Sequence, residues 1–335
     1  MRIPALISVV IGLAVLVALV VMNGAVGIEA GIAAAGWGIA AVILMHLPQT
    51  LFSAQGWRAV VAVPRRRSAA AMFGMRLIRE AVNGLLPVAQ IGGDIVGARL
   101  LVRSGVPLSA AGASVVVDVT LEMLSQVAFT LLGVGLLITT PGAAALPHLA
   151  AAVLVAGLCI LVVIFIAAQR FGLFRLLEGG LLRLARRLDW KGLEDVSGLH
   201  LAILALYKSP RRLMAGTAWH CLSWLFGGFE VLVALHVLGI PCGVREAMII
   251  ESVGQASRAV AFAVPAGLGV QEGGLILICG LLGISLQQAI ELSLLKRIRE
   301  LVLGVPGLLV WYRIEGLCAA VPADAQDKLS RETTS

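Results

Sequence analysis

The sequence predicts an all-α polytopic membrane protein with about six full spans and two broken re-entrant hairpins of opposite orientation. Three observations lead to this fold class: an apolar composition, apolar stretches of membrane length, and two charged segments interrupted by proline and glycine. Of the 335 residues, 59% are hydrophobic and 13% are charged, whereas about a quarter of the residues in soluble domains are charged. A water-soluble fold is therefore excluded.

Four apolar stretches approach or exceed the roughly 20 residues that a helix needs to cross a hydrocarbon core. They lie at residues 4–22, 31–47, 143–168 and 213–240. Further spans are expected at residues 108–138 and 286–312. The first stretch also fits a signal peptide, with Asn23-Gly24-Ala25 as a cleavage-like segment. We expect an uncleaved first helix, because the stretch is long and further spans follow it.

The positions of the basic residues explain the net charge of +7. Four arginines lie at residues 58–67, and nine further Lys and Arg residues lie at residues 170–212. The positive-inside rule places both regions, and both termini, on the cytoplasmic side of a bacterial inner membrane. This distribution favours a membrane surface over nucleic acid, so no nucleic-acid partner is expected.

The basic region also sets the expected domain organisation. Residues 1–313 form a single transmembrane domain, and residues 314–335 form a cytoplasmic tail that is expected to be disordered. Within the domain, residues 169–212 mix apolar and basic side chains at helical spacing. They fit either an interfacial helix on anionic lipid or a solvated pair of cytoplasmic helices.

Two segments differ from ordinary spans because they carry charges and helix breakers. Hairpin 1, at about residues 75–103, is broken at Pro87, Gly92 and Gly93. Hairpin 2, at about residues 246–283, is broken at Pro265, Gly267 and Gly269. Unpaired backbone and charge cannot face lipid, so each segment is expected to be buried in protein or to line a wet cavity as two half-helices.

The two hairpins overlay with a single offset of 178 residues. This offset relates three pairs of charged residues: Glu80 with Arg258, Asp94 with Glu272, and Glu122 with Glu300. Three full spans separate the hairpins, and an odd number makes the second enter from the opposite face. The pattern predicts an inverted repeat, a common build among secondary transporters.

Ionisable side chains in apolar surroundings are the candidate residues of a substrate cavity. They are Asp94, Asp118, Glu122, Arg258, Glu272, Arg299 and Glu300. Each costs about 2.5–3.5 kcal/mol at the bilayer centre if it stays unpaired, so each must pair, bind a proton or face water.

Helical spacing places several of these residues on shared faces. Asp118 and Glu122 lie four residues apart, and they form either the wall of a cavity or proton site, or an interhelical contact that fixes packing. Lys296 is placed to pair with Glu300, and Arg299 is placed to neutralise an acid on another element. Two glycines on the Glu300 side, at residues 304 and 307, indicate a close helix contact.

No cofactor, metal ion or catalytic residue is expected. The five cysteines are widely spaced, without a metal-ligand pattern. The glycine-rich segment at residues 265–274 lacks the Lys-Ser/Thr of a nucleotide-binding P-loop. Its glycines still offer backbone N–H groups to an anion such as a lipid phosphate.

Three motifs resemble those of a known family. They are Asn83-x3-Pro87-x4-Gly92-Gly93-Asp94, the segment Val264-Pro-Ala-Gly-Leu-Gly-Val-Gln-Glu272-Gly-Gly, and Arg299-Glu300 with Gly304 and Gly307. On these residues the chain resembles the transmembrane domain of the lysylphosphatidylglycerol synthase family, also called the flippase-like domain. Within that family it is most similar to the branch found with hopanoid biosynthesis in bacteria. The resemblance covers residues 3–312.

The resemblance implies a lipid-translocating domain without ATPase parts. In this branch the substrate would be a hopanoid or an associated polar lipid, and the partners would be membrane lipids and hopanoid-biosynthesis enzymes. No soluble aminoacyl-transferase domain follows Arg313, so lipid aminoacylation is not expected.

Three hypotheses of function follow. The leading one is a flippase or secondary transporter in which Asp94 and Glu272 border a central cavity for a polar head group. The second is an intramembrane lipid-modifying enzyme that uses Asp118, Glu122 and Glu300 as acid–base groups. The third is a scaffold that organises lipid-synthesis enzymes through the basic region.

Overall fold

The computed structural model describes residues 35–63, 67–86, 91–139, 198–260 and 270–319, with four single residues at 156, 157, 160 and 163. Within these ranges all regular structure is helical and no strand is present, which confirms the all-α class. The expected span at residues 4–22, all but these four residues of the expected span at 143–168, and most of the segment at residues 169–212 lie outside the described residues. So do Pro87, Pro265, Gly267 and Gly269.

Two of the described helices are long and apolar enough to cross a membrane: α6 (Leu108–Ile138) and α10 (Pro210–Val237). Their bounds lie within three residues of the predicted spans. Before α10, the short helix α9 (Leu199–Tyr207) packs against α6.

Helix α3 (Gly38–Val60) extends well beyond the apolar stretch predicted at residues 31–47. Its second half contains Pro48 and then the polar residues Gln49, Thr50 and Ser53, all of which are buried. The hydropathy of the sequence predicts that the span ends at the first polar residues. In the folded protein, neighbouring helices cover these polar side chains, and the helix continues past them.

The first broken segment consists of α4 (Ala69–Leu85) and α5 (Gly92–Arg103), which pack against each other. Helix α4 ends where Leu86 turns to an extended conformation, as a residue that precedes a proline prefers. The side-chain Oδ1 of Asn83 then accepts a hydrogen bond of 2.7 Å from the Gly93 amide. A Cβ at Gly93 would collide with the Arg79 carbonyl oxygen, so glycine is required where α5 meets α4.

The second broken segment also contains two helices that pack against each other. It consists of α11 (Val244–Val260) and α12 (Val270–Leu281), and α13 (Leu286–Ala319) follows. Both ends of α12 lie 178 residues after those of α5, and α13 begins 178 residues after α6. Helix α13 continues through Ala319, so the first six residues of the expected disordered tail are helical; residues 320–335 lie outside the described ranges.

The turns that end α5 and α12 match bond for bond. Gly105 and Gly283 have positive φ values of 86° and 77°. The amide of Val106 donates to the Leu101 carbonyl at 3.2 Å, and the amide of Ile284 donates to the Cys279 carbonyl at 2.9 Å. This 6→1 bond around a left-handed glycine is the Schellman motif, and both copies are again 178 residues apart.

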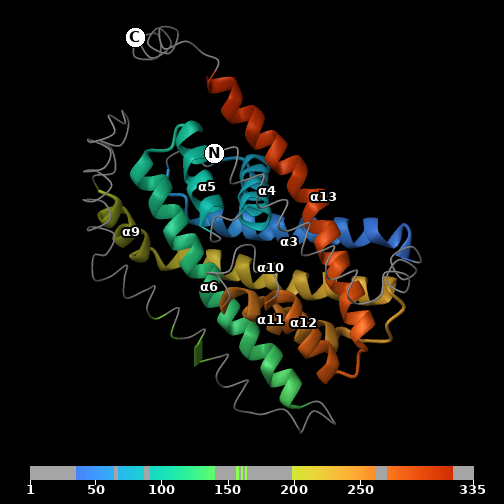
Figure 1. Ribbon diagram of the computed structural model, residues 1–335. Coiled ribbons are helices and arrows are strands. Elements are labelled where there is room, and N and C mark those ends of the chain that lie inside the picture. The colour runs from blue at the N-terminus through green and yellow to red at the C-terminus, as the bar shows by residue number, and fades with distance from the viewer. Residues whose placement is uncertain are drawn as a thin grey trace, which may run out of the picture.

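The helices form two units, α3–α6 and α10–α13, whose elements interlock. Helices α3 and α10 lie side by side and antiparallel across the middle, with Gly38 against Val237 and Gly56 against His220 (Figure 1). Helix α6 of the first unit packs on α11 of the second, and α13 packs on α4. In Figure 1, α6 and α13 run in opposite directions.

Glycines bring α13 close to α4, as the sequence predicted. A Cβ on Gly304 would lie 2.6 Å from the Leu85 Cδ1 atom, and a Cβ on Gly307 would lie 2.9 Å from the Ala81 Cβ atom.

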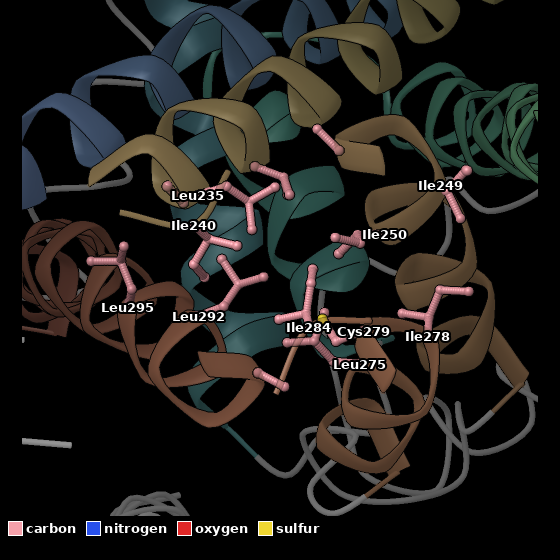
Figure 2. Close-up of a cluster of buried hydrophobic side chains, with 14 of the residues drawn as sticks. Leu235, Ile240, Ile249, Ile250, Leu275, Ile278, Cys279, Ile284, Leu292 and Leu295 are labelled. Atoms are coloured by element: carbon pink, nitrogen blue, oxygen red, sulfur yellow. The ribbon is translucent and has the colours of Figure 1, made fainter. Parts of the chain in front are cut away.

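Each unit has an apolar core, and the two cores use equivalent positions. Figure 2 shows the core of the second unit, to which α10, α11, α12 and α13 contribute. Five pairs of fully buried residues, one member in each core, are related by the offset of 178: Trp57 with Leu235, Met72 with Ile250, Leu101 with Cys279, Ala111 with Ala289, and Val117 with Leu295. The repetition therefore extends from helix ends to core packing.

Candidate functional site

A cavity of about 480 Å³ lies between the two units. Side chains from α3, α4, α5, α6, α10, α11 and α13 line it. They include five of the residues that the sequence predicted for a substrate cavity: Asp94, Glu122, Arg258, Arg299 and Glu300.

Equivalent positions of the two units line this cavity. Five pairs of lining residues are 178 apart: His46 with Trp224, Leu77 with Gln255, Glu80 with Arg258, Glu122 with Glu300, and Gln126 with Gly304. The repeat therefore contributes equivalent positions from both units to the lining of one cavity.

A stripe of charged residues on α4 forms the wall of the first unit. Arg76 contacts Glu122 of α6 at 2.5 Å and Glu80, one turn along α4, at 3.0 Å. Arg79 contacts Asp94 of α5 at 2.5 Å. Its guanidinium also lies over the Trp57 ring, 5.2 Å from the centroid.

Asp118 lies behind this wall and does not line the cavity. Its side chain is fully buried and accepts hydrogen bonds from Arg79 at 2.5 Å and from Arg76 at 3.5 Å. The ring Nε2 of His220 on α10 lies 2.9 Å from its other oxygen. With three partners around it, Asp118 fixes the position of the α4 arginines.

In the second unit, Glu300 is the central carboxylate. It contacts Arg297 at 2.7 Å and Arg258 at 3.2 Å. Arg297 also contacts Glu272 at 2.5 Å, and Glu272 is buried behind the cavity instead of bordering it. Arg297 therefore connects Glu272 to Glu300, which lines the cavity.

Two predicted contacts of α13 have different outcomes. Arg299 neutralises an acid on another element, as expected, because it contacts Glu230 of α10 at 2.8 Å. The predicted pair of Lys296 with Glu300 is not formed. The Lys296 ammonium instead lies 2.5 Å from Glu251 on α11, because the neighbouring arginines occupy both oxygens of Glu300.

His46 of α3 joins the charges of the two units. Its Nδ1 lies 2.7 Å from Glu230 and its Nε2 lies 3.7 Å from Glu80. Through this ring a series of contacts of at most 4.0 Å runs from Asp94 on α5 to Glu272 on α12. Its successive members are Asp94, Arg79, Asp118, Arg76, Glu80, His46, Glu230, Arg299, Glu300, Arg297 and Glu272.

This interior is costly to maintain. Each buried ion pair gives up hydration that its Coulomb attraction repays only with good geometry, so buried pairs are weak evidence for stability. Four nearly buried side chains that line the cavity also carry a polar atom without a hydrogen-bond partner: Gln49 Oε1, Ser53 Oγ, Gln126 Nε2 and Arg299 Nε. Such atoms are rare in native proteins and call for water or a ligand.

Sequence reasoning missed His46, Arg76 and Arg79 as site residues. The spacing of Arg76, Arg79 and Glu80 contains a signal, because residues three and four apart share a helix face. His46 offers none, since it is a lone histidine in an apolar stretch. Among the described side chains, no group of three His, Cys, Asp or Glu residues is placed to hold a metal ion.

Comparison with known proteins gives one family. The family described as "Lysylphosphatidylglycerol synthase TM region" matches residues 6–307, which include all the helices that build the cavity up to the middle of α13. No curated protein and no solved structure matches the chain. The chain therefore belongs to the lysylphosphatidylglycerol synthase TM region family, and it is a membrane protein of lipid synthesis or lipid flipping.

Proposed function

We propose that the protein is a lipid flippase or secondary transporter that moves a polar lipid between the leaflets of a bacterial inner membrane. The observation that supports this most is the cavity between the two units, where equivalent positions carry charge and several buried polar atoms lack a partner. In this proposal the cavity receives the lipid head group.

The size and charge of the cavity suit a polar head group. Its volume of about 480 Å³ lies within the range of small-molecule sites. Four arginines and four carboxylates line it: Arg76, Arg79, Arg258, Arg299, Glu80, Asp94, Glu122 and Glu300. This balance favours a head group that is zwitterionic or rich in hydroxyls, because either kind can bond to both signs of charge.

The repetition of the helices supports a transport mechanism. We propose that α3–α6 and α10–α13 are inverted repeats, that the segments α4–α5 and α11–α12 are re-entrant hairpins from opposite faces, and that both termini are cytoplasmic. The opposite directions of α6 and α13 support the inversion (Figure 1). Inverted repeats around a site near the midplane give two access states by exchanging the conformations of the two halves.

The resemblance to the hopanoid-associated branch makes a hopanoid or an associated polar lipid the first substrate to test. We propose that no bond of the lipid is made or broken. Of the three acid–base groups of the enzyme alternative, Glu122 and Glu300 line the cavity, whereas Asp118 is fully buried and bound by Arg76, Arg79 and His220. The scaffold alternative depends on the basic region, most of which lies outside the described residues.

Filling the cavity tests the proposal. Gly84 lines the cavity and has no heavy atom within 4 Å of the place of a Cβ, so Gly84→Leu adds volume there without a backbone clash. Gly74 on the same helix has equally open surroundings but does not line the cavity. Gly74→Leu is therefore the matched control.

The assay uses purified protein in liposomes with head-group-labelled hopanoid and phospholipid. We expect exchange of one of these lipids between leaflets in the wild type and in Gly74→Leu, with no new lipid by mass spectrometry. In Gly84→Leu we expect exchange to slow at least about tenfold, equivalent to ~1.4 kcal/mol of barrier. Equal rates in both variants would refute the assignment of the cavity, a new lipid product would indicate an enzyme, and absence of both would leave the scaffold.

A further inference from the structure

The two contacts of His46 Nδ1 cannot both be hydrogen bonds in one protonation state of the ring. Its Nδ1 lies 2.7 Å from Glu230 Oε2, which only accepts hydrogen bonds, and 2.8 Å from Arg299 Nη1, which only donates them. A neutral ring with a bare Nδ1 accepts from Arg299. A protonated ring donates from Nδ1 to Glu230. The site therefore provides a partner for each state.

Charged groups approach His46 from every helix that packs on α3. Helix α4 presents Glu80, with Nε2 at 3.7 Å, and α10 presents Glu230. Helix α13 presents Arg299, with Glu300 and Lys296 beside it. Helix α6 contributes Asp118 and Glu122, which reach the ring only through Arg76 and Glu80.

The carboxylates of this interior outnumber its permanently charged cations, so the excess negative charge can be balanced by bound protons. Among the described residues, eight carboxylates take part in the ion pairs of this interior: Glu80, Asp94, Asp118, Glu122, Glu230, Glu251, Glu272 and Glu300. Six fixed cations accompany them: Arg76, Arg79, Arg258, Lys296, Arg297 and Arg299. The difference of two equals the number of histidines in contact with these acids, His46 and His220.

Only His46 of these two histidines faces the cavity. Its side chain is 16% exposed, whereas that of His220 is 1% exposed. It also lies between the units, since Glu80 belongs to the first unit while Glu230 and Arg299 belong to the second. Its repeat partner, 178 residues on, is Trp224, which cannot titrate. The histidine is therefore not repeated at the equivalent position of the second unit.

We infer that His46 is the binding site of a coupling proton, and that proton movement through the cavity accompanies lipid movement. A proton from cavity water binds to Nδ1, the hydrogen bond from Arg299 to Nδ1 breaks, and the new N–H donates to Glu230. Release reverses these steps. This inference rests on the proposed lipid transport and adds its energy source.

The first test does not depend on transport. In detergent-solubilised protein with isotope-labelled histidine, the signal of His46 is the one lost in His46→Asn. We expect this ring to take up and release a proton as the pH is varied and its neutral form to carry the proton on Nε2. A ring that does not titrate, or a neutral form protonated on Nδ1, would overturn the inference while leaving lipid transport intact.

The second test measures coupling in liposomes that contain a trapped pH indicator. In the wild type and in His236→Asn, which removes an exposed histidine of α10, we expect proton flux during lipid exchange and a change of about tenfold in exchange rate across two pH units. His46→Asn keeps an amide that accepts from Arg299 or donates to Glu230 but does not titrate. We expect lipid exchange in this variant without proton flux and with a flat pH profile. Unchanged proton flux in His46→Asn would refute the site.

Discussion

The ion pairs of Arg79 allow a quantitative test of the buried network. Arg79 is 3% exposed and contacts both Asp94 and Asp118 at 2.5 Å. Replacement by methionine keeps the length of the side chain and removes the charge. Because breaking a buried pair leaves an uncompensated charge, such changes cost about 3–5 kcal/mol.

The structure indicates the lower end of that range. Without Arg79, Asp118 keeps the ring of His220 at 2.9 Å and Arg76 at 3.5 Å, and the Asp94 side chain is already 18% exposed at the cavity. We expect Arg79→Met to lower the free energy of unfolding by about 3 kcal/mol. Asp94→Asn, which leaves the contact of Arg79 with Asp118 intact, should cost about 1 kcal/mol.

The assay is reversible unfolding in mixed micelles, read by intrinsic fluorescence, with the two variants combined in a double-mutant cycle. Because both side chains share one contact, the double variant should lose about 1 kcal/mol less than the sum of the single losses. The control is Arg99→Met, which removes a pair with Glu315 that is 64% exposed on the arginine side and should cost less than about 1 kcal/mol. A similar loss in Arg79→Met and Arg99→Met, or strict additivity in the cycle, would refute this account.

Three further predictions concern packing and topology. Gly307→Ala should lower the free energy of unfolding by about 1–3 kcal/mol, because its Cβ would lie 2.9 Å from that of Ala81, whereas Gly280→Ala, with open surroundings, should be nearly neutral in the same micelle assay. Trp57→Ala should cost about 3–5 kcal/mol because the ring is fully buried in the core of the first unit, and a loss below 1 kcal/mol would contradict that placement. In a cysteine-free background, a membrane-impermeant maleimide applied to intact spheroplasts should label Pro241→Cys but not Lys208→Cys, both exposed positions, and the reverse pattern would overturn the proposed orientation.

Hydropathy and helix breakers predicted the elements well where one helix determines the outcome. The ends of α6 and α10 follow from apolar length, and Gly92 and Gly93, two of the predicted helix breakers, begin α5. The offset of 178, found from three charged pairs, also relates helix ends, turns and core positions. Helix α3 was predicted too short, because its polar second half is buried by other helices and reads as a loop in hydropathy.

The partners of the charged residues could not be predicted in the same way. Spacing along a helix shows which side chains share a face, but it does not identify the helix opposite. Lys296 was therefore assigned to Glu300 on its own helix, although Glu251 on α11 lies closer. Glu272 was placed at the cavity by symmetry with Asp94, whereas an arginine of α13 holds it behind the wall. His46 gained its role only from groups that arrive on α4, α10 and α13.

The reciprocal packing of α6 on α11 and of α13 on α4 bears on how the chain assembles. The last helix of each unit packs against the other unit, so the interior of each unit is covered partly by a helix of its neighbour. A fragment with only α3–α6 would leave uncovered the surface of α4 at Ala81 and Leu85, against which the glycines of α13 pack. The first unit can therefore finish folding only after α10–α13 have been synthesised, and we expect the two units to fold together.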